Sequence, residues 1–137
     1  MTRENVEAVE AAYAALNHSG VDALGTYWTE DVNWRAMEGA PDDRGPIHGR
    51  DAMRAYVQDW FDMFDELRWE PVELIDAGGN QVIAVVHFSG RAKLSRIETN
   101  MTFAVVHTIR DGKVAVGREY ATRQEALEAA GSSGRDA

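Results

Sequence analysis

Two residues towards the C-terminal end of the chain, His107 and Glu119, form a candidate acid–base pair. His107 stands in the run Glu98–Arg110, which has the residue pattern of a β-strand. Alternation along a strand puts His107 on the same face as the apolar Phe103 and Ile109. A carboxylate and an imidazole in an apolar cavity would shift each other's pKa and could serve as general acid and base near neutral pH. We therefore name His107 and Glu119 as the candidate catalytic residues.

The direction in which Glu119 points depends on the turn at Asp111–Gly112. We expect a type I turn in which the glycine is an αL bulge residue, and this turn would place Glu119 on the same face as His107. A plain two-residue turn would reverse the register, so that Arg118 and Tyr120 would face inwards instead. The alternative interpretation of the pair is that His107 is a packed strand histidine and Glu119 a surface or dimer-interface carboxylate.

Aromatic residues supply the candidate ligand-binding side chains, because large rings suit the wall of a pocket for an apolar molecule. Arg35 is adjacent to Trp34, so the two side chains take opposite faces, and we favour Trp34 for the pocket. Aromatic residues at helical spacing are also typical of an ordinary core, and both roles coincide where the core is the pocket wall. The six candidates are Trp28, Trp34, Tyr56, Trp60, Phe88 and Phe103.

The other histidines have simpler explanations. His87 stands between Val86 and Phe88, which belong to an apolar face, so we expect His87 on the opposite, outer face. His48 precedes a predicted helix and fits capping or loop packing, with a place at the pocket mouth as the alternative. The histidines show no metal-ligand spacing, so we predict no structural metal.

Helices followed by a meander of strands must position these side chains. This order indicates an α+β domain in which a cone-shaped, curved mixed β-sheet wraps around three to four α-helices and encloses a central cavity. Residues 38–48 are rich in Gly, Pro and Asp and are expected to form a loop. Periodicity and a capping box at 122–125 predict helices over 6–16, 21–28, 49–65 and 123–130, and strands over 32–37, 67–76, 81–91, 98–110 and 113–121.

Length and composition limit the classes of function. The 137 residues fit one domain over 1–131, with a frayed tail over 132–137. The net charge of −9 disfavours nucleic acid and anionic membranes as partners. The absence of cysteine excludes disulfides, cysteine zinc sites and thiol nucleophiles. The sequence has no signal sequence and no long apolar run, so we expect a cytoplasmic location. It has no phosphate-binding loop, so we expect no nucleotide cofactor.

Several stretches, taken in order, resemble the SnoaL-like proteins of the nuclear-transport-factor-two-like superfamily, which also holds the ketosteroid isomerases. The resemblance extends over nearly the whole chain, from about residue 6 to residue 131. It implies the cone fold with its cavity, and a homodimer packed sheet to sheet. The stretches are AYAALN at 12–17, VDAL at 21–24, EDVNW at 30–34, HGRDA at 48–52, IRDGKV at 109–114 and RQEALEAAG at 123–131.

The same resemblance does not bring a known set of catalytic residues with it. The ketosteroid isomerase tyrosine would fall near Ala12, beside Tyr13, and its general base near Ala36. Its oxyanion-hole aspartate would fall near Phe103 or Ala104, so none of these groups is kept, and the steroid isomerase interpretation fails unless Tyr13 or another group has taken over. The Asp–Arg–Asp set of the superfamily's epoxide hydrolases has no counterpart that we can place.

Two hypotheses about function follow. The first is a cofactor-free cyclase, isomerase or dehydratase that acts by proton transfer, through His107 and Glu119, on an apolar polyketide- or terpenoid-like substrate. The second is a non-catalytic ligand-binding or accessory dimerisation domain with the same cavity. They differ in whether the cavity holds a titratable pair, so enzyme status stays open on the sequence alone.

Overall fold

The structure, a computed structural model, describes residues 2–39 and 45–136. It is an α+β fold built on one six-stranded mixed sheet with the strand order β2-β1-β6-β5-β4-β3. β1 runs parallel to β6, and the other neighbouring strands are antiparallel. The elements are α1 (Thr2–Ser19), the 3-10 helix η1 (Gly20–Ala23), α2 (Leu24–Tyr27), β1 (Trp28–Arg35), β2 (Ile47–His48), α3 (Arg50–Met63), β3 (Phe64–Gly78), β4 (Gln81–Ala92), β5 (Glu98–Arg110), β6 (Lys113–Tyr120) and α4 (Arg123–Asp136).

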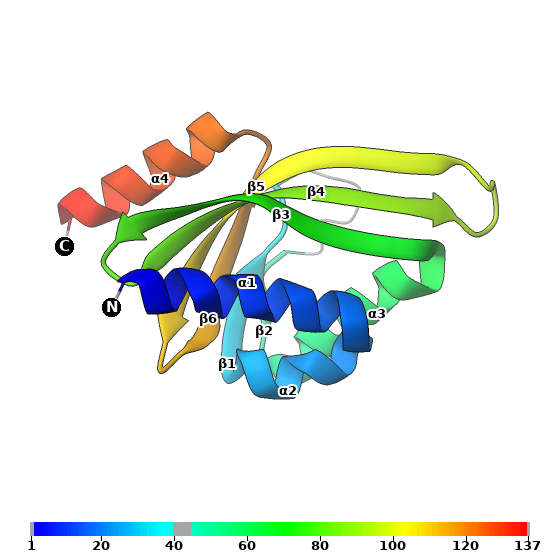
Figure 1. The fold of residues 1–137 in the computed structure, drawn as a ribbon, viewed down its shortest axis with the longest axis horizontal. Helices are drawn as coiled ribbons and strands as arrows, with labels where there is room; N and C mark the ends of the chain where they lie inside the picture. The colour runs from blue at the N-terminus through cyan, green and yellow to red at the C-terminus, as the bar shows by residue number, and fades with distance from the viewer. Residues whose placement is uncertain (1, 40–44, 137) are drawn as a thin grey trace.

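The helices cover the two faces of the sheet unequally. α1, α2 and α3 lie on one face, and α4 lies alone on the opposite face (Figure 1). The sheet bends around the three helices without closing into a barrel, so its inner face forms the wall of a cone. Register shifts along the β3–β4 pair support the bend, because each extra residue in a strand increases the local twist. β3 is an edge strand, which is where a strand tolerates a proline such as Pro71.

Two separate hydrophobic clusters hold these layers together. The larger one fills the space between the inner face of the sheet and α1, α2 and α3, and includes the fully buried Leu24, Val86 and Phe88. The smaller one lies between the outer face and α4 and is made of Ile83, Ala104, Val106, Ala126 and Ala130. The inner cluster therefore defines the cone, and the outer cluster attaches the last helix.

The predicted elements are present, and their bounds differ from the predicted ones; the predicted strand over 32–37, for example, is β1 at Trp28–Arg35, and the predicted helix over 49–65 ends at Met63 because Phe64 begins β3. The predicted helix over 21–28 is a 3-10 turn followed by the short α2, because Trp28 already begins β1. The predicted loop contains a short strand, β2, that pairs with β1 at Asn33 and Trp34; its residues 40–44 lie outside the described residues. α4 continues to Asp136, beyond the predicted end at Ala130, and the frayed tail over 132–137 stays a prediction.

The capping box at the start of α4 is confirmed. The backbone N–H of Glu125 donates to Thr122 Oγ1 at 3.1 Å, and the backbone N–H of Thr122 donates to Glu125 Oε1 at 3.2 Å. Each side chain thus satisfies one of the donors that a helix leaves unpaired at its first turn. Among the described residues, no helix is both long and apolar enough to cross a membrane.

Candidate functional site

A cavity of about 780 Å³ lies between α1, α3 and the inner face of the sheet. Its wall is mainly aromatic and aliphatic, and the charged side chains among the described lining residues are the carboxylates Asp59, Asp62 and Glu119. The remaining lining residues are Tyr13, Leu16, Trp28, Trp34, Met37, Met53, Tyr56, Val57, Trp60, Met63, Phe64, Trp69, Phe88, Thr99, Met101 and Phe103. A cavity of this size and character suits a small, largely apolar molecule.

All six aromatic residues named from the sequence lie in this wall. Trp28 and Trp34 come from β1, Tyr56 and Trp60 from α3, and Phe88 and Phe103 from β4 and β5. The structure places them at the cavity, and their contact with a ligand stays a prediction.

Several of these rings pack against one another where α3 meets β3 and β4. Trp60 stacks on Phe64 at a centroid distance of 5.6 Å and meets Phe88 edge-on at 5.1 Å. Phe64 also meets Phe88 edge-on at 5.3 Å. Gly90 allows this packing, because a Cβ there would lie 3.2 Å from Phe64 Cβ. Such offset and edge-to-face pairs fix the rings in place, so this part of the wall is preformed.

Glu119 points into the cone and is held by a hydrogen bond from Trp34. The indole Nε1–H of Trp34 donates to Glu119 Oε2 at 2.9 Å, which joins β1 to β6 across their parallel pairing. The Trp34 ring lies over Gly117, where a Cβ would come within 2.2 Å of ring carbons. Gly117 is therefore the residue that lets Trp34 reach the carboxylate.

The inward direction of Glu119 does not come from the predicted turn. Asp111 and Gly112 both have positive φ, of 54° and 76°, in a two-residue connection between Arg110 and Lys113. These angles are typical of a type I′ turn, so the predicted type I turn with a glycine bulge is wrong. The turn alone would point Glu119 to the outer face. A register shift further along the hairpin, between Thr108 and Ile109, brings Glu119 back to the same face as His107.

His107 lies behind the cavity wall rather than in it. Its side chain is 1% exposed and is not among the lining residues. The rings of Tyr13 and Trp34 meet it edge-on at centroid distances of 5.5 and 5.8 Å. Burial lowers the pKa of His107 to about 4, because the imidazolium form would lose its hydration. At neutral pH the ring is therefore uncharged.

Tyr13 connects His107 to the cavity, and the sequence analysis named it only as a possible replacement for the isomerase tyrosine and not as a site residue. Its hydroxyl lies 2.9 Å from His107 Nε2, and the residue itself lines the cavity. Burial, and secondarily the charge of Glu119, raise the pKa of Tyr13. The contact between Tyr13 and His107 has no local signal in the sequence, since the two residues are 94 positions apart.

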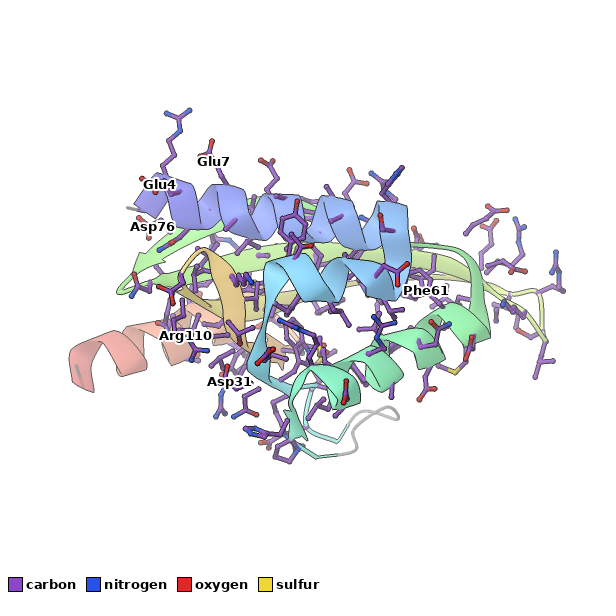
Figure 2. The ribbon with its side chains drawn as sticks, turned by 90° about the horizontal axis from the view of Figure 1, so that it is seen from below. Glu4, Glu7, Asp31, Phe61, Asp76 and Arg110 are labelled. Atoms are coloured by element: carbon purple, nitrogen blue, oxygen red, sulfur yellow. The ribbon has the colours of Figure 1, made fainter. Side chains whose placement is uncertain are left out.

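The cavity wall does not include His87, His48 or Asp31. His87 is on the outer face, as expected, where its ring nitrogens lie 3.2 Å from Thr102 Oγ1 and from Asn100 Oδ1. His48 is an exposed residue of β2. Asp31 pairs with Arg110 on the surface (Figure 2), and neither residue is part of the cavity lining. Among residues 2–39 and 45–136, no group of three or more potential ligands is placed to hold a metal ion.

Comparison with known proteins adds a family and a fold. The sequence model of the SnoaL-like domain matches residues 9–117 of the chain. An NTF2-like protein from Burkholderia xenovorans LB400 is 28% identical, with a TM-score of 0.73 and coverage of 95% of this chain and 97% of that chain. None of the curated proteins matches the chain.

More distant solved structures share the fold alone. TerC, co-crystallised with polyporic acid, is 22% identical, with a TM-score of 0.74 over 91% of this chain and 98% of that chain. A putative SnoaL-like polyketide cyclase from Jannaschia sp. CCS1 is 17% identical, with a TM-score of 0.74 over 93% of this chain and 91% of that one.

Proposed function

The chain belongs to the SnoaL-like domain family, and on this premise we propose that it binds a small, largely apolar ring molecule in the cone and moves a proton on it. In this proposal Glu119 touches the substrate and acts as the general base and then as the general acid. His107 acts only through Tyr13. The substrate is of a polyketide- or terpenoid-like class, and the reaction is a cyclisation, isomerisation or dehydration that needs no cofactor.

The observation that carries the proposal is the place of Glu119 in the wall of an otherwise mainly apolar cavity. A carboxylate close to an apolar substrate can take a proton from an activated C–H bond and return it to another atom of the same molecule. The hydrogen bond from Trp34 to Oε2 orients the carboxyl group. The preformed aromatic wall would hold the substrate in one pose, which lowers the entropic cost of reaching the reactive geometry.

The test is deuterium exchange. Cyclic ketones that also carry a hydroxyl group, and hydroxylated polyketide mimics, would be incubated with the protein in D₂O, and exchange at the carbon beside the carbonyl would be followed by NMR. We expect exchange with wild type and a loss of at least about 10²-fold in Glu119→Gln, because the amide cannot carry the proton. The amide oxygen can still accept from Trp34, so binding should persist.

The matched control is Glu128→Gln, which makes the same change on the exposed surface of α4 and should leave exchange unchanged. Exchange that is equally fast in wild type and Glu119→Gln would contradict the proposal. Binding without exchange in wild type would favour the second candidate function, a non-catalytic binding domain. The observation that favours this candidate is that His107 is enclosed and neutral. Of the predicted acid–base pair, only Glu119 therefore lies at the cavity.

The homodimer expected from the resemblance also remains a proposal. The outer face of the sheet would form the interface, but α4 already covers the part of it made by Ile83, Ala104 and Val106. A dimer through this face would therefore use α4 or the uncovered ends of β3, β4 and β5. Analytical ultracentrifugation of wild type would show a dimer or contradict it.

A further inference from the structure

The two nitrogens of His107 have different partners, and the difference fixes where its proton lies. Nδ1 is 3.3 Å from the carbonyl oxygen of Val82, which can only accept a hydrogen bond. Nδ1 must therefore carry the hydrogen of the neutral ring. Nε2 is then bare, and the Tyr13 hydroxyl 2.9 Å away donates to it.

This tautomer determines what Tyr13 can offer to the cavity. A tyrosine hydroxyl has one proton, and that of Tyr13 is used on His107. Tyr13 lines the cavity, and its hydroxyl group consequently has only oxygen lone pairs left to offer to a ligand there. The neighbouring donor is used in the same way, because the Trp34 Nε1–H donates to Glu119. At this wall, Tyr13 and Glu119 both face the cavity as acceptors.

We propose that Tyr13 is a specificity-determining residue at its own part of the cavity wall, where it selects ligands that bring a hydrogen-bond donor, such as a phenol or enol hydroxyl. His107 is the positioning residue that enforces the choice. The inference rests on the proposed function, because it takes the ligand to lie in the cone. It goes beyond that function by assigning the polarity of the recognised group: a molecule with only carbonyl or ether oxygens finds no donor in Tyr13.

The first experiment compares two ligands of similar shape, 2-naphthol and 2-methoxynaphthalene, by their displacement of the neutral fluorescent probe Nile red. We expect wild type to bind 2-naphthol about fivefold more tightly or better, the effect of one buried neutral hydrogen bond. Tyr13→Phe should lose this preference by weakening 2-naphthol alone. Tyr120→Phe removes a hydroxyl from the outer side of β6 and should keep the preference.

His107→Leu tests the positioning role, since a residue that merely fills space would not reverse ligand preference. Without Nε2, the Tyr13 proton becomes available to the cavity. We expect 2-methoxynaphthalene to bind more tightly to His107→Leu than to wild type. Unchanged preference in His107→Leu would overturn the role of His107.

A second measurement uses wild type alone and does not depend on a variant folding. Long-range ¹H–¹⁵N NMR of the His107 ring distinguishes the two tautomers, and we expect a protonated Nδ1 with a bare Nε2. A protonated Nε2 would overturn the inference. Equal binding of the two ligands by wild type would overturn it while leaving the proposed function intact. If neither Nile red nor either ligand bound, the proposed function would fail and the inference with it.

Discussion

His107 and His87 lie on neighbouring central strands but on opposite faces of the same sheet, and their chemical surroundings differ. His107 is buried, neutral and held by Tyr13 and the Val82 carbonyl. His87 lies at the outer surface beside Thr102, where water can replace its partners. The face of the sheet, rather than the residue type, decides which polar groups have their pKa shifted by burial. On the inner face, packing fixes the positions of side chains, whereas the outer face tolerates amino-acid substitutions.

Among substitutions that test this difference between the faces, we expect the largest loss of stability from Gly117→Ala on the inner face. The added Cβ would lie 2.2 Å from ring carbons of Trp34, so the ring or the strand must move. We expect the free energy of unfolding to fall by about 3 kcal/mol or more, in the upper range for overpacking. Urea denaturation followed by circular dichroism measures it.

The matched control for this change is Gly131→Ala in α4, where an added Cβ meets nothing within 4 Å. It should leave stability unchanged or raise it by up to about 1 kcal/mol, because alanine favours helix. A Gly117→Ala protein as stable as Gly131→Ala would break the contrast between the faces.

The next effect is a pH dependence carried by the inner histidine. The pKa of His107 falls from 6.5 to about 4 on folding, so the unfolded chain binds more protons between these pH values. The contribution of this shift to the free energy of unfolding is fully present above pH 6.5. It is lost as the pH falls towards 4, and the loss is on the order of 3 kcal/mol. Urea unfolding at stepwise pH should show the loss, in addition to that of the carboxylates.

Two histidine variants test whether the pH dependence of stability comes from the inner face of the sheet. His107→Leu cannot take up the proton, so its unfolding free energy should vary less between pH 6.5 and 4 than that of wild type. His87→Leu, the same change on the outer face, should follow the wild-type curve. A steep pH dependence retained in His107→Leu would contradict the assignment.

A smaller effect is expected from Thr122→Ala at the start of α4. This change removes the capping box that begins α4 on the outer face, and it should lower the free energy of unfolding by about 1 kcal/mol. Thermal unfolding would measure the change in Tm. Thr26→Ala, at an exposed position in α2, is the control and should change Tm less.

The smallest effect should come from Arg123→Ala, which breaks an outer-face ion pair with Glu73. Arg123 Nε and Nη2 donate to the two carboxylate oxygens at 2.9 and 3.1 Å, but both side chains are well exposed. Water and salt screen such a pair, so we expect no resolvable change in the urea midpoint at physiological ionic strength. A drop as large as that of Gly117→Ala would show that the outer face is not tolerant.

The fold could be predicted because its signals are local. The alternation in β4 separates Val82, Val86 and Phe88 from His87, and the structure keeps that separation. The capping box at Thr122 likewise needs only its own turn. The helical pattern of α3 also identified Tyr56 and Trp60 as wall residues, because core and wall coincide there.

The site was harder to predict because it depends on distant pairings. Asp111–Gly112 has the composition of a type I′ turn, which alone would point Glu119 outwards, and the compensating bulge near Thr108 leaves no clear mark in the sequence. The role of Tyr13 likewise requires α1 to lie against His107 of β5. No local pattern contains that contact.

The Trp34 ring seated on Gly117 also limits the order in which this protein can change. A larger residue at 117 is acceptable only after Trp34 has been reduced, whereas a smaller residue at 34 needs no prior change. Mutational paths that place a side chain at position 117 must therefore start at position 34, and they give up the donor to Glu119 at that first step. Directed evolution that changes both positions would be expected to change them in that sequence.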